Sequence, residues 1–84
     1  MSDRNTYKYR LKDGNRIVYI GITNDLDRRE REHRNEGMTF TKMEKVGNIT
    51  TEKAASAWEE EAIRRYKQQH RDDRPKYNNN DSGK

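Results

Sequence analysis

Apolar and polar residues alternate near the start of the chain, and this alternation predicts a β-hairpin. Residues 7–11 carry a large apolar side chain at every second position, with basic side chains between them. Residues 17–22 form a β-branched and aromatic run, which is typical of a strand. Asp13-Gly14-Asn15, between the two segments, is a turn signal. The described pattern therefore predicts two antiparallel strands near the start of the chain.

The form of that turn decides whether Tyr9 and Tyr19 share a face of the hairpin. Successive side chains of a strand point to opposite faces, so a two-residue Asp13-Gly14 loop places the two tyrosines on opposite faces. A three-residue loop, or one bulge at Gly14, places them on the same face. A site shared by both side chains therefore predicts an odd-length or bulged turn.

A helix is predicted after the hairpin. Thr23-Asn24-Asp25 supplies N-cap candidates, the helix runs to about Glu36, and Gly37 fits its C-cap. Most of its side chains are charged, so it must pack along a narrow stripe. That stripe holds the residues at positions i, i+3 and i+7, which are Leu26, Arg29 and His33.

The second half of the chain predicts one more strand and one more helix. The strand covers Phe40 to Val46, and Gly47-Asn48 then predicts a turn. The helix begins near Thr50 or Thr51 and runs to about Gln69. Its buried stripe, which includes small alanines that allow close packing on the sheet, consists of Ala55, Trp58, Ala62, Ile63 and Tyr66.

Two features of the second half of the chain concern a candidate functional site. Glu59 stands beside Trp58 and one turn before Ile63, so we expect it at the edge of the buried stripe. Pro75 ends any helix, and Tyr77 can fix the following segment against the core. We expect one domain over residues 1–78 and a flexible polar tail over residues 79–84.

Composition limits how large the core can be. Of 84 residues, 27% are hydrophobic and 40% are charged, so we expect a folded domain with a thin core that metal, DNA or a partner stabilises. The absence of Cys excludes disulfides and thiolate zinc sites. No apolar run is long enough for a signal peptide or a membrane span. We therefore expect a soluble, intracellular protein, cytoplasmic or nucleoid-associated, with no membrane partner.

Basic residues gather in two segments of a chain whose net charge is +4. Residues 1–20 carry five basic and two acidic side chains, and residues 64–76 carry six and two. If the segments converge they form a phosphate-binding rim, which permits nucleic acid as a partner. Such contacts position DNA but carry little sequence information. The candidates for phosphate contacts are Arg10, Arg16, Arg64, Arg65, Arg71 and Lys76.

The polar candidates match the groups that a one-metal phosphodiesterase needs. Tyr9 and Tyr19 supply hydroxyls that help to activate water, and Arg29 supplies a guanidinium for the pentavalent phosphate. His33 adds an imidazole, and the carboxylate of Glu59 can hold a divalent cation. The alternative is that the tyrosines fill strand positions and the charges are solvated surface.

The order and spacing of these residues resemble the GIY-YIG nuclease family over residues 5–78. The first half-motif is Tyr7-Lys8-Tyr9 rather than Gly-Ile-Tyr, so Tyr9 is the counterpart of the final tyrosine and Tyr7 is the competing assignment. The second half-motif and its continuation are closer to the family pattern. They comprise Tyr19-Ile20-Gly21-Ile22-Thr23-Asn24, then Leu26, Arg29 and His33, then Trp58-Glu59, and finally Pro75-Lys76-Tyr77-Asn78.

The resemblance implies an α+β fold, in which a three-stranded antiparallel sheet begins with a hairpin and is flanked by two to three helices. It also implies hydrolysis of DNA phosphodiesters through one Mg²⁺ or Mn²⁺ ion, which Glu59 would ligate. Tyr9 would position or deprotonate water, supported by Tyr19, with their pKa values lowered by Arg29 or the metal. Arg29 would neutralise the phosphate, and His33 would shuttle a proton or hold a tyrosine. Asn78 would orient Glu59 or its neighbours.

Two other classes of function are compatible with the sequence. One is a nucleic-acid-binding module that keeps the fold but does no chemistry, and the other is a structural or protein-interaction domain. The presence of both Arg29 and Glu59 favours the nuclease. For a nuclease this small we expect low sequence specificity or a preference for a DNA structure, with a partner protein as a possible source of targeting.

Overall fold

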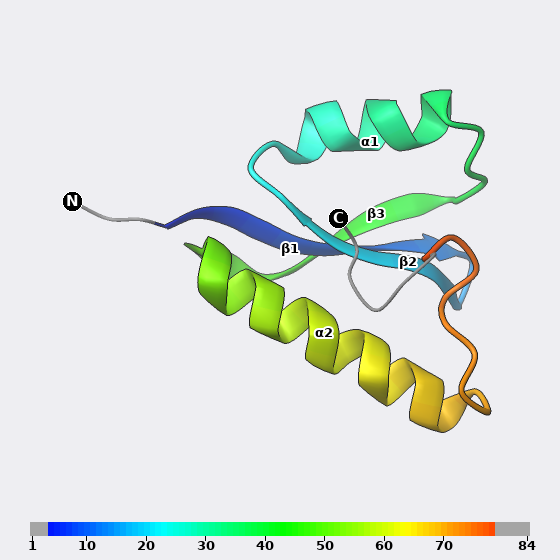
Figure 1. Cartoon of the computed structure of the whole chain (residues 1–84). Helices are drawn as coiled ribbons and strands as arrows, with labels where there is room; N and C mark the ends of the chain where they lie inside the picture. Colours follow the sequence, from blue (N-terminus) through cyan, green and yellow to red (C-terminus); the bar gives the residue numbers. More distant parts are fainter. Residues whose placement is uncertain (1–3, 79–84) are drawn as a thin grey trace.

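The computed structural model describes residues 4–78 and shows a three-stranded antiparallel sheet with a helix on either side (Figure 1). In chain order the elements are β1 (Arg4–Asp13), β2 (Arg16–Thr23), α1 (Leu26–Asn35), β3 (Lys42–Thr51) and α2 (Glu52–Gln69). The strand order is β2-β1-β3, so β1 is the central strand. The predicted α+β class is confirmed, with two helices among the described residues. The predicted tail, residues 79–84, lies outside them.

The hairpin places Tyr9 and Tyr19 on one face by means of a bulge. Its turn has two residues, because Asp13 pairs with Arg16. The register then shifts: Lys12 pairs with Ile17 and Leu11 pairs with Tyr19, which leaves Val18 as the extra residue of β2. Tyr9 pairs with Gly21, so both tyrosines lie on the same face as Leu11. The predicted shared face is confirmed, and the bulge lies at Val18 rather than at Gly14.

The third strand differs from the prediction at both of its ends. β3 covers Lys42–Thr51, and Phe40 lies before it as a buried residue under the guanidinium of Arg34, 4.2 Å from the ring centroid. The predicted turn at Gly47-Asn48 is wrong, because both residues lie within β3.

A break in pairing explains the failed turn prediction. Thr6 pairs with Thr50 and Lys8 pairs with Val46, so β3 has extra residues between its two paired segments. Gly47 has a φ of +65°, a conformation that glycine adopts without a steric penalty in bulges as well as in turns. The chain therefore bulges at Gly47 and then continues along the sheet.

Both helices begin and end where the sequence predicts. Asp25 caps α1, and its side chain accepts a hydrogen bond from the Arg28 N–H. Thr51 caps α2 in the same way by accepting from the Ala54 N–H. Both helices start at the end of the sheet where β1 begins (Figure 1). No helix within residues 4–78 combines the length and the apolar character needed to cross a bilayer.

The core has two layers, one beneath each helix, and they differ in the side chains that fill them. Between the sheet and α1 lie mainly large side chains, which are Tyr9, Leu11, Val18, Tyr19 and Phe40, with Leu26, Met38, Met43 and Tyr77 around them. On α2 the fully buried residues are Ala55, Glu59 and Ile63, whereas Trp58, Ala62 and Tyr66 are half-buried. Glu59 is only 1% exposed, so it lies within the buried stripe and not at its edge as predicted.

The segment after α2 returns to the sheet along the outer edge of β2. The Tyr77 N–H donates to the Val18 carbonyl at 2.8 Å, and the Tyr77 hydroxyl accepts from the Thr39 N–H at 3.0 Å. The predicted attachment of Tyr77 to the core is confirmed. Figure 1 shows this segment running from the end of α2 back to the sheet beside β2.

Asn78 completes the edge of β2. Its Oδ1 accepts from the Ile20 N–H at 2.9 Å, and its Nδ2 donates to the Ile20 carbonyl at 3.0 Å. Both of these side-chain bonds go to the residue between Tyr19 and Gly21. One amide side chain satisfies two backbone groups that a strand edge otherwise leaves to solvent.

We predict that Asn78→Ala destabilises the domain by roughly 1–3 kcal/mol, because it leaves the buried N–H and carbonyl of Ile20 without these partners. Urea denaturation measures the change. Asn48→Ala, at an exposed position of β3, is the matched control. Equal losses in the two variants would show that the Asn78–Ile20 bonds contribute nothing.

Candidate active site

Three rings from the sheet and α1 pack against one another. The Tyr9 and Tyr19 centroids are 6.1 Å apart and their planes lie 25° from parallel. The imidazole of His33 lies 5.8 Å from the Tyr9 ring and 4.6 Å from the Tyr19 ring. His33 is fully buried. The structure thus brings together three of the predicted residues, and of the two competing first-motif tyrosines it places Tyr9 in this cluster.

Hydrogen bonds link the polar atoms of the cluster. The Tyr9 hydroxyl lies 2.7 Å from His33 Nε2. The Arg29 guanidinium interacts with the hydroxyls of both Tyr9 and Tyr19 and lowers the pKa of each. It is itself held by the carboxylate of Glu32, 3.0 Å away. Arg29 therefore acts on both hydroxyls, while its own position is set by Glu32 on α1.

Glu32 is a supporting residue that sequence reasoning missed. It was one of many charged residues on the predicted helix and had no apolar neighbour to set it apart. Its spacing contains the signal, because side chains at i and i+3 of a helix lie on the same face and can pair. Glu32 stands at i+3 from Arg29.

Gly21 provides the space in which the tyrosine side chains lie. A Cβ at this position would stand 2.7 Å from Tyr19 Cε1 and 2.7 Å from the Tyr9 hydroxyl oxygen. Real Cβ atoms do not approach other atoms so closely. The glycine of the second half-motif is therefore required by packing, because the two rings cross the strand at the point where a side chain would be.

Burial dominates the electrostatics of the tyrosines. It raises the pKa of Tyr9 well above the ordinary value of 10, and the Tyr19 charge adds to that effect. Burial also raises the pKa of Tyr19. Arg29 lowers both pKa values, but by less than burial raises them. The expected lowering by Arg29 is therefore present but smaller than the effect of burial, and both phenols are neutral at pH 7.

Burial also sets the charge of the imidazole. It lowers the pKa of His33 from 6.5 to about 4, with a further decrease from the positive charge of Arg29. His33 is therefore neutral at physiological pH. Burial lowers the pKa of Arg29, but the bonds to Glu32, Tyr9 and Tyr19 outweigh it, so the guanidinium stays charged.

Glu59 brings a carboxylate to this cluster from the helix on the other side of the sheet (Figure 1). After the larger effects of burial and Arg29, its charge also raises the pKa of Tyr19, so the carboxylate acts electrostatically on the Tyr19 hydroxyl. Its Oε2 atom is buried and accepts no hydrogen bond from the described residues. A buried carboxylate oxygen is costly unless a donor or a cation satisfies it.

These groups fit a single divalent cation with mostly non-protein ligands. Within residues 4–78 no group of three or more His, Asp or Glu side chains gathers as a metal cluster. Glu59 offers carboxylate oxygens, which suit Mg²⁺ or Mn²⁺ better than softer metals. The coordination shell of the cation would therefore consist of one carboxylate from this chain together with water and phosphate oxygens.

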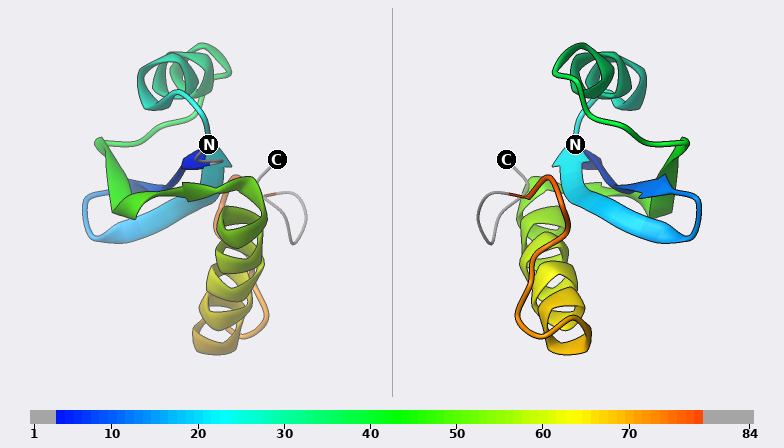
Figure 2. Two further views of the ribbon diagram at one scale, coloured as in Figure 1. Left: turned by 90° about the vertical axis from the view of Figure 1, so that its left-hand side faces the viewer. Right: turned by 90° about the vertical axis from the view of Figure 1, so that its right-hand side faces the viewer.

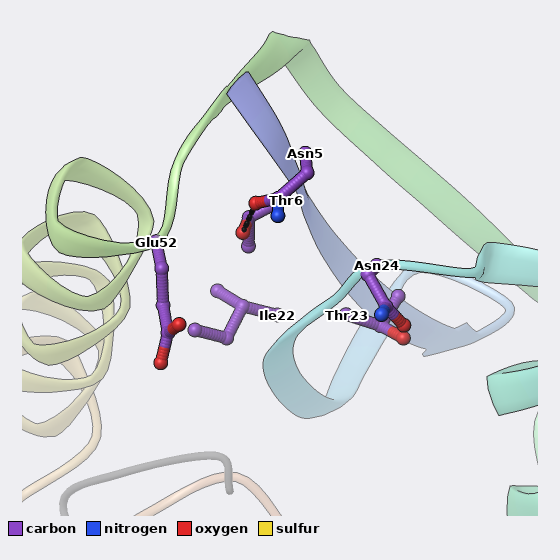
Figure 3. A pocket seen from close by; sticks show the side chains of 6 residues that line it. All are labelled: Asn5, Thr6, Ile22, Thr23, Asn24 and Glu52. Carbon is purple, nitrogen blue, oxygen red and sulfur yellow. Dashed lines mark hydrogen bonds between the residues drawn. The ribbon is translucent and has the colours of Figure 1, made fainter. Parts of the chain in front are cut away.

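The remaining motif residues line the end of the sheet where β1 begins and β2 ends. Figure 3 shows a pocket of about 270 Å³ there, lined by Asn5, Thr6, Ile22, Thr23, Asn24 and Glu52. Thr23 shapes the connection to α1, because its Oγ1 accepts from the Asp25 N–H at 3.1 Å. Tyr7 lines a second pocket beside Asn24 and Lys45. Tyr7 lies two residues before Tyr9 on β1, and Thr23 lies two residues after Gly21 on β2, so these residues adjoin the tyrosine cluster.

The six predicted phosphate contacts lie on different parts of the fold. Arg10 alternates with Tyr9 along β1 and therefore lies on the opposite face of the sheet. Arg64 and Arg65 form ion pairs with Glu61 on α2. The others are exposed at the hairpin turn and after α2: Arg16, Arg71 and Lys76. The two basic segments thus do not form a rim on the tyrosine side alone.

Neither a protein-family model, nor a curated protein, nor a solved structure matches this chain. Its functional interpretation therefore depends on the residues and their geometry.

We predict that Gly21→Ala destabilises the protein by about 1–3 kcal/mol and separates Tyr9 from His33, because the new methyl group needs the space of both rings. Urea denaturation gives the loss, and the NMR shifts of the His33 ring report the separation. Gly37→Ala is the control: it meets no atom within 4 Å and has a φ of +87°. Gly37→Ala should cost about 1 kcal/mol because alanine is strained at this positive φ, and it should leave the NMR shifts of the His33 ring unchanged.

We predict that His33 makes stability depend on pH. Its pKa is lower in the folded protein, about 4, than the ordinary 6.5, so the unfolded chain binds the proton first as pH falls. The His33 contribution is complete above about pH 6.5 and is lost progressively between pH 6.5 and pH 4. Urea midpoints across this range measure it. His33→Gln should show a flatter dependence, and parallel curves would contradict the prediction.

Proposed function

We propose that this protein is a GIY-YIG-type endonuclease that hydrolyses DNA phosphodiester bonds with one Mg²⁺ or Mn²⁺ ion. The observation that carries the proposal is the grouping of Tyr9, Tyr19, Arg29 and His33 beside the buried carboxylate of Glu59. The same residues carry the motif resemblance in the sequence. A core that only had to be stable would not favour so many buried polar groups, because each costs free energy when it is removed from water.

Arg29 would bind the scissile phosphate. It is partly exposed, with 26% of its side chain accessible, so one side can meet a ligand while the other holds the tyrosines. A guanidinium offers a planar fork that matches two phosphate oxygens. Its charge would offset the negative charge that builds on the phosphate as the bond breaks.

Tyr9 and His33 would move the proton of the attacking water. A neutral phenol is a poor base, but the Tyr9 hydroxyl can accept a proton from water while it passes its own to His33 Nε2, 2.7 Å away. The low pKa of His33 opposes this transfer in the free protein. A bound phosphate adds negative charge beside Arg29 and so raises that pKa, which couples proton acceptance to the presence of substrate.

Glu59 would hold the metal. Its buried Oε2 atom and the nearby Tyr19 hydroxyl provide an oxygen environment at the edge of the cluster. When bound, a divalent ion polarises the phosphate and lowers the pKa of a coordinated water. Tyr19 would keep the carboxylate and the phosphate in register, since its hydroxyl bonds Arg29 and lies near Glu59.

The substrate would be chosen with little help from base sequence. The exposed basic groups are arginines and lysines suited to phosphates, and such contacts depend on backbone position and shape. We therefore propose low intrinsic sequence specificity. A preference for a nick, flap or junction, or recruitment by a partner protein, would supply targeting.

The decisive test is nicking of supercoiled plasmid by the purified protein with Mg²⁺, Mn²⁺ or EDTA. Glu59→Gln keeps the shape of the side chain but removes its charge, and it should reduce metal-dependent nicking by about a hundredfold or more. Glu60→Gln is the matched control because Glu60 is the next residue and is exposed. It should cleave like the unaltered protein.

A second measurement, thermal unfolding with and without metal, tests metal binding separately from catalysis. Mg²⁺ or Mn²⁺ should raise the melting temperature of the unaltered protein and of Glu60→Gln, because a ligand that binds the folded state stabilises it. It should leave that of Glu59→Gln unchanged. Cleavage that persists in Glu59→Gln would remove the metal-ligand assignment. DNA binding without cleavage in the unaltered protein would favour a binding module instead.

A further inference from the structure

The face of the sheet turned away from the tyrosines carries a line of positive charge. Lys8, Arg10 and Lys12 alternate with Tyr9 and Leu11 along β1, so they share the opposite face. Across the strand pair, Glu44 stands opposite Arg10, and Lys42 stands opposite Lys12. We call these five residues, four cations and one carboxylate, the basic strip.

The basic strip is accessible. The side chains of Arg10 and Lys42 are 39% and 58% exposed, whereas those of Lys12 and Glu44 are 22% and 28% exposed. The helix on this face, α2, approaches the strip at Lys8, whose Nζ lies 6.0 Å from the Trp58 ring centroid. Figure 2 shows α2 diverging from the sheet toward the hairpin end, where the other members of the strip lie.

One carboxylate holds the strip together without neutralising it. Arg10 Nε donates to Glu44 at 2.6 Å, and the ammonium groups of Lys42 and Lys12 lie 3.5 Å and 3.9 Å from the same side chain. Arg10 keeps the pKa of Glu44 below its ordinary value, so the carboxylate is ionised. A single negative charge among four positive ones leaves most of the positive charge uncompensated.

The fold does not need this arrangement. Lys12 and Lys42 are directly opposite on neighbouring strands, and like charges at such a pair destabilise a sheet. Lys8 lies beside Gly47, where an added Cβ would come within 3.3 Å of Lys8 Nζ. A line of cations that places like charges opposite each other, with Arg10 held by Glu44, has the character of a binding surface.

The shape of the strip indicates its partner. Same-face residues on a strand are about 7 Å apart, so three cations on β1 form a straight row rather than a compact patch. Successive phosphates of a nucleic-acid strand also form a row of regularly spaced negative charges. We propose that the basic strip binds a nucleic-acid backbone on the face of the sheet opposite the tyrosine cluster.

This proposal differs from the predicted phosphate contacts, of which Arg10 is the one member in the strip. It is independent of catalysis, because binding to this face involves none of the residues in the tyrosine cluster. A DNA-bound protein would then contact nucleic acid on two sides, with a second segment or a second strand against the basic strip.

The test measures binding of a short fluorescent DNA duplex by anisotropy in EDTA, so that cleavage plays no part. Lys12→Gln combined with Lys42→Gln should weaken binding by about tenfold at about 0.1 M salt and reduce the salt slope by about 2. Its melting temperature should be unchanged or higher, since the opposed charges are gone. The control, Arg31→Gln with Lys53→Gln, removes two exposed charges elsewhere and should change affinity much less.

Glu44→Gln provides a change in the opposite direction, which loss of folding cannot imitate. It removes the negative charge of the strip and should tighten DNA binding by about threefold, with a steeper salt dependence. Weaker binding by Glu44→Gln, or equal losses in the strip and control variants, would overturn the proposal. Displacement of DNA by polyglutamate at equal charge concentration would overturn the assignment to nucleic acid.

Discussion

The extra residue at Val18 determines the chemistry that the hairpin can support. A two-residue turn with regular pairing would place Tyr19 opposite Arg10 and on the far face from Tyr9. The bulge shifts the register by one, so that Tyr19 comes opposite Leu11 and Tyr9 comes opposite Gly21. Only then do both hydroxyls reach the same Arg29 and lie beside the same imidazole. Val18 itself is buried in the core, and this burial fixes the bulge at that position.

The domain has little apolar material, and groups of the candidate site make up much of what it buries. Tyr9, His33 and Glu59 are among its largest fully buried side chains. Folding must therefore compensate their polar atoms by hydrogen bonds or by a ligand. Stability and activity are linked in such a domain, because a change that empties the site also weakens the core. A cation at Glu59 and a phosphate at Arg29 would both strengthen the folded state.

Periodicity was sufficient to predict most of the fold and much of the site. Alternation located the hairpin, and helical spacing put Arg29 and His33 on one face before any contact was known. The burial of Glu59 could not be predicted in this way, since a carboxylate beside Trp58 reads as the border of an apolar stripe. Its location depends on how α2 meets the sheet, which is a tertiary property.

The errors came from residues whose local signal has two meanings. Gly47 with Asn48 fits a turn and a bulge equally well, and the choice depends on the length of β1, which continues to Arg4 and keeps β3 paired beyond the irregularity. The net pKa of the tyrosines could not be predicted, because the sequence shows the cation, Arg29, but not the depth of burial. Long-range pairing and desolvation are the two quantities that local patterns do not contain.

Asn78 and Tyr77 have a consequence for how the chain matures during synthesis. Their partners in β2, Ile20 and Val18, are made nearly sixty residues earlier, since Asn78 and Ile20 are 58 positions apart. Until the later segment leaves the ribosome, the outer edge of the hairpin has unsatisfied backbone groups and the Tyr19–Gly21 strand is uncovered. The working arrangement of the tyrosines is therefore completed late, after both helices have been translated.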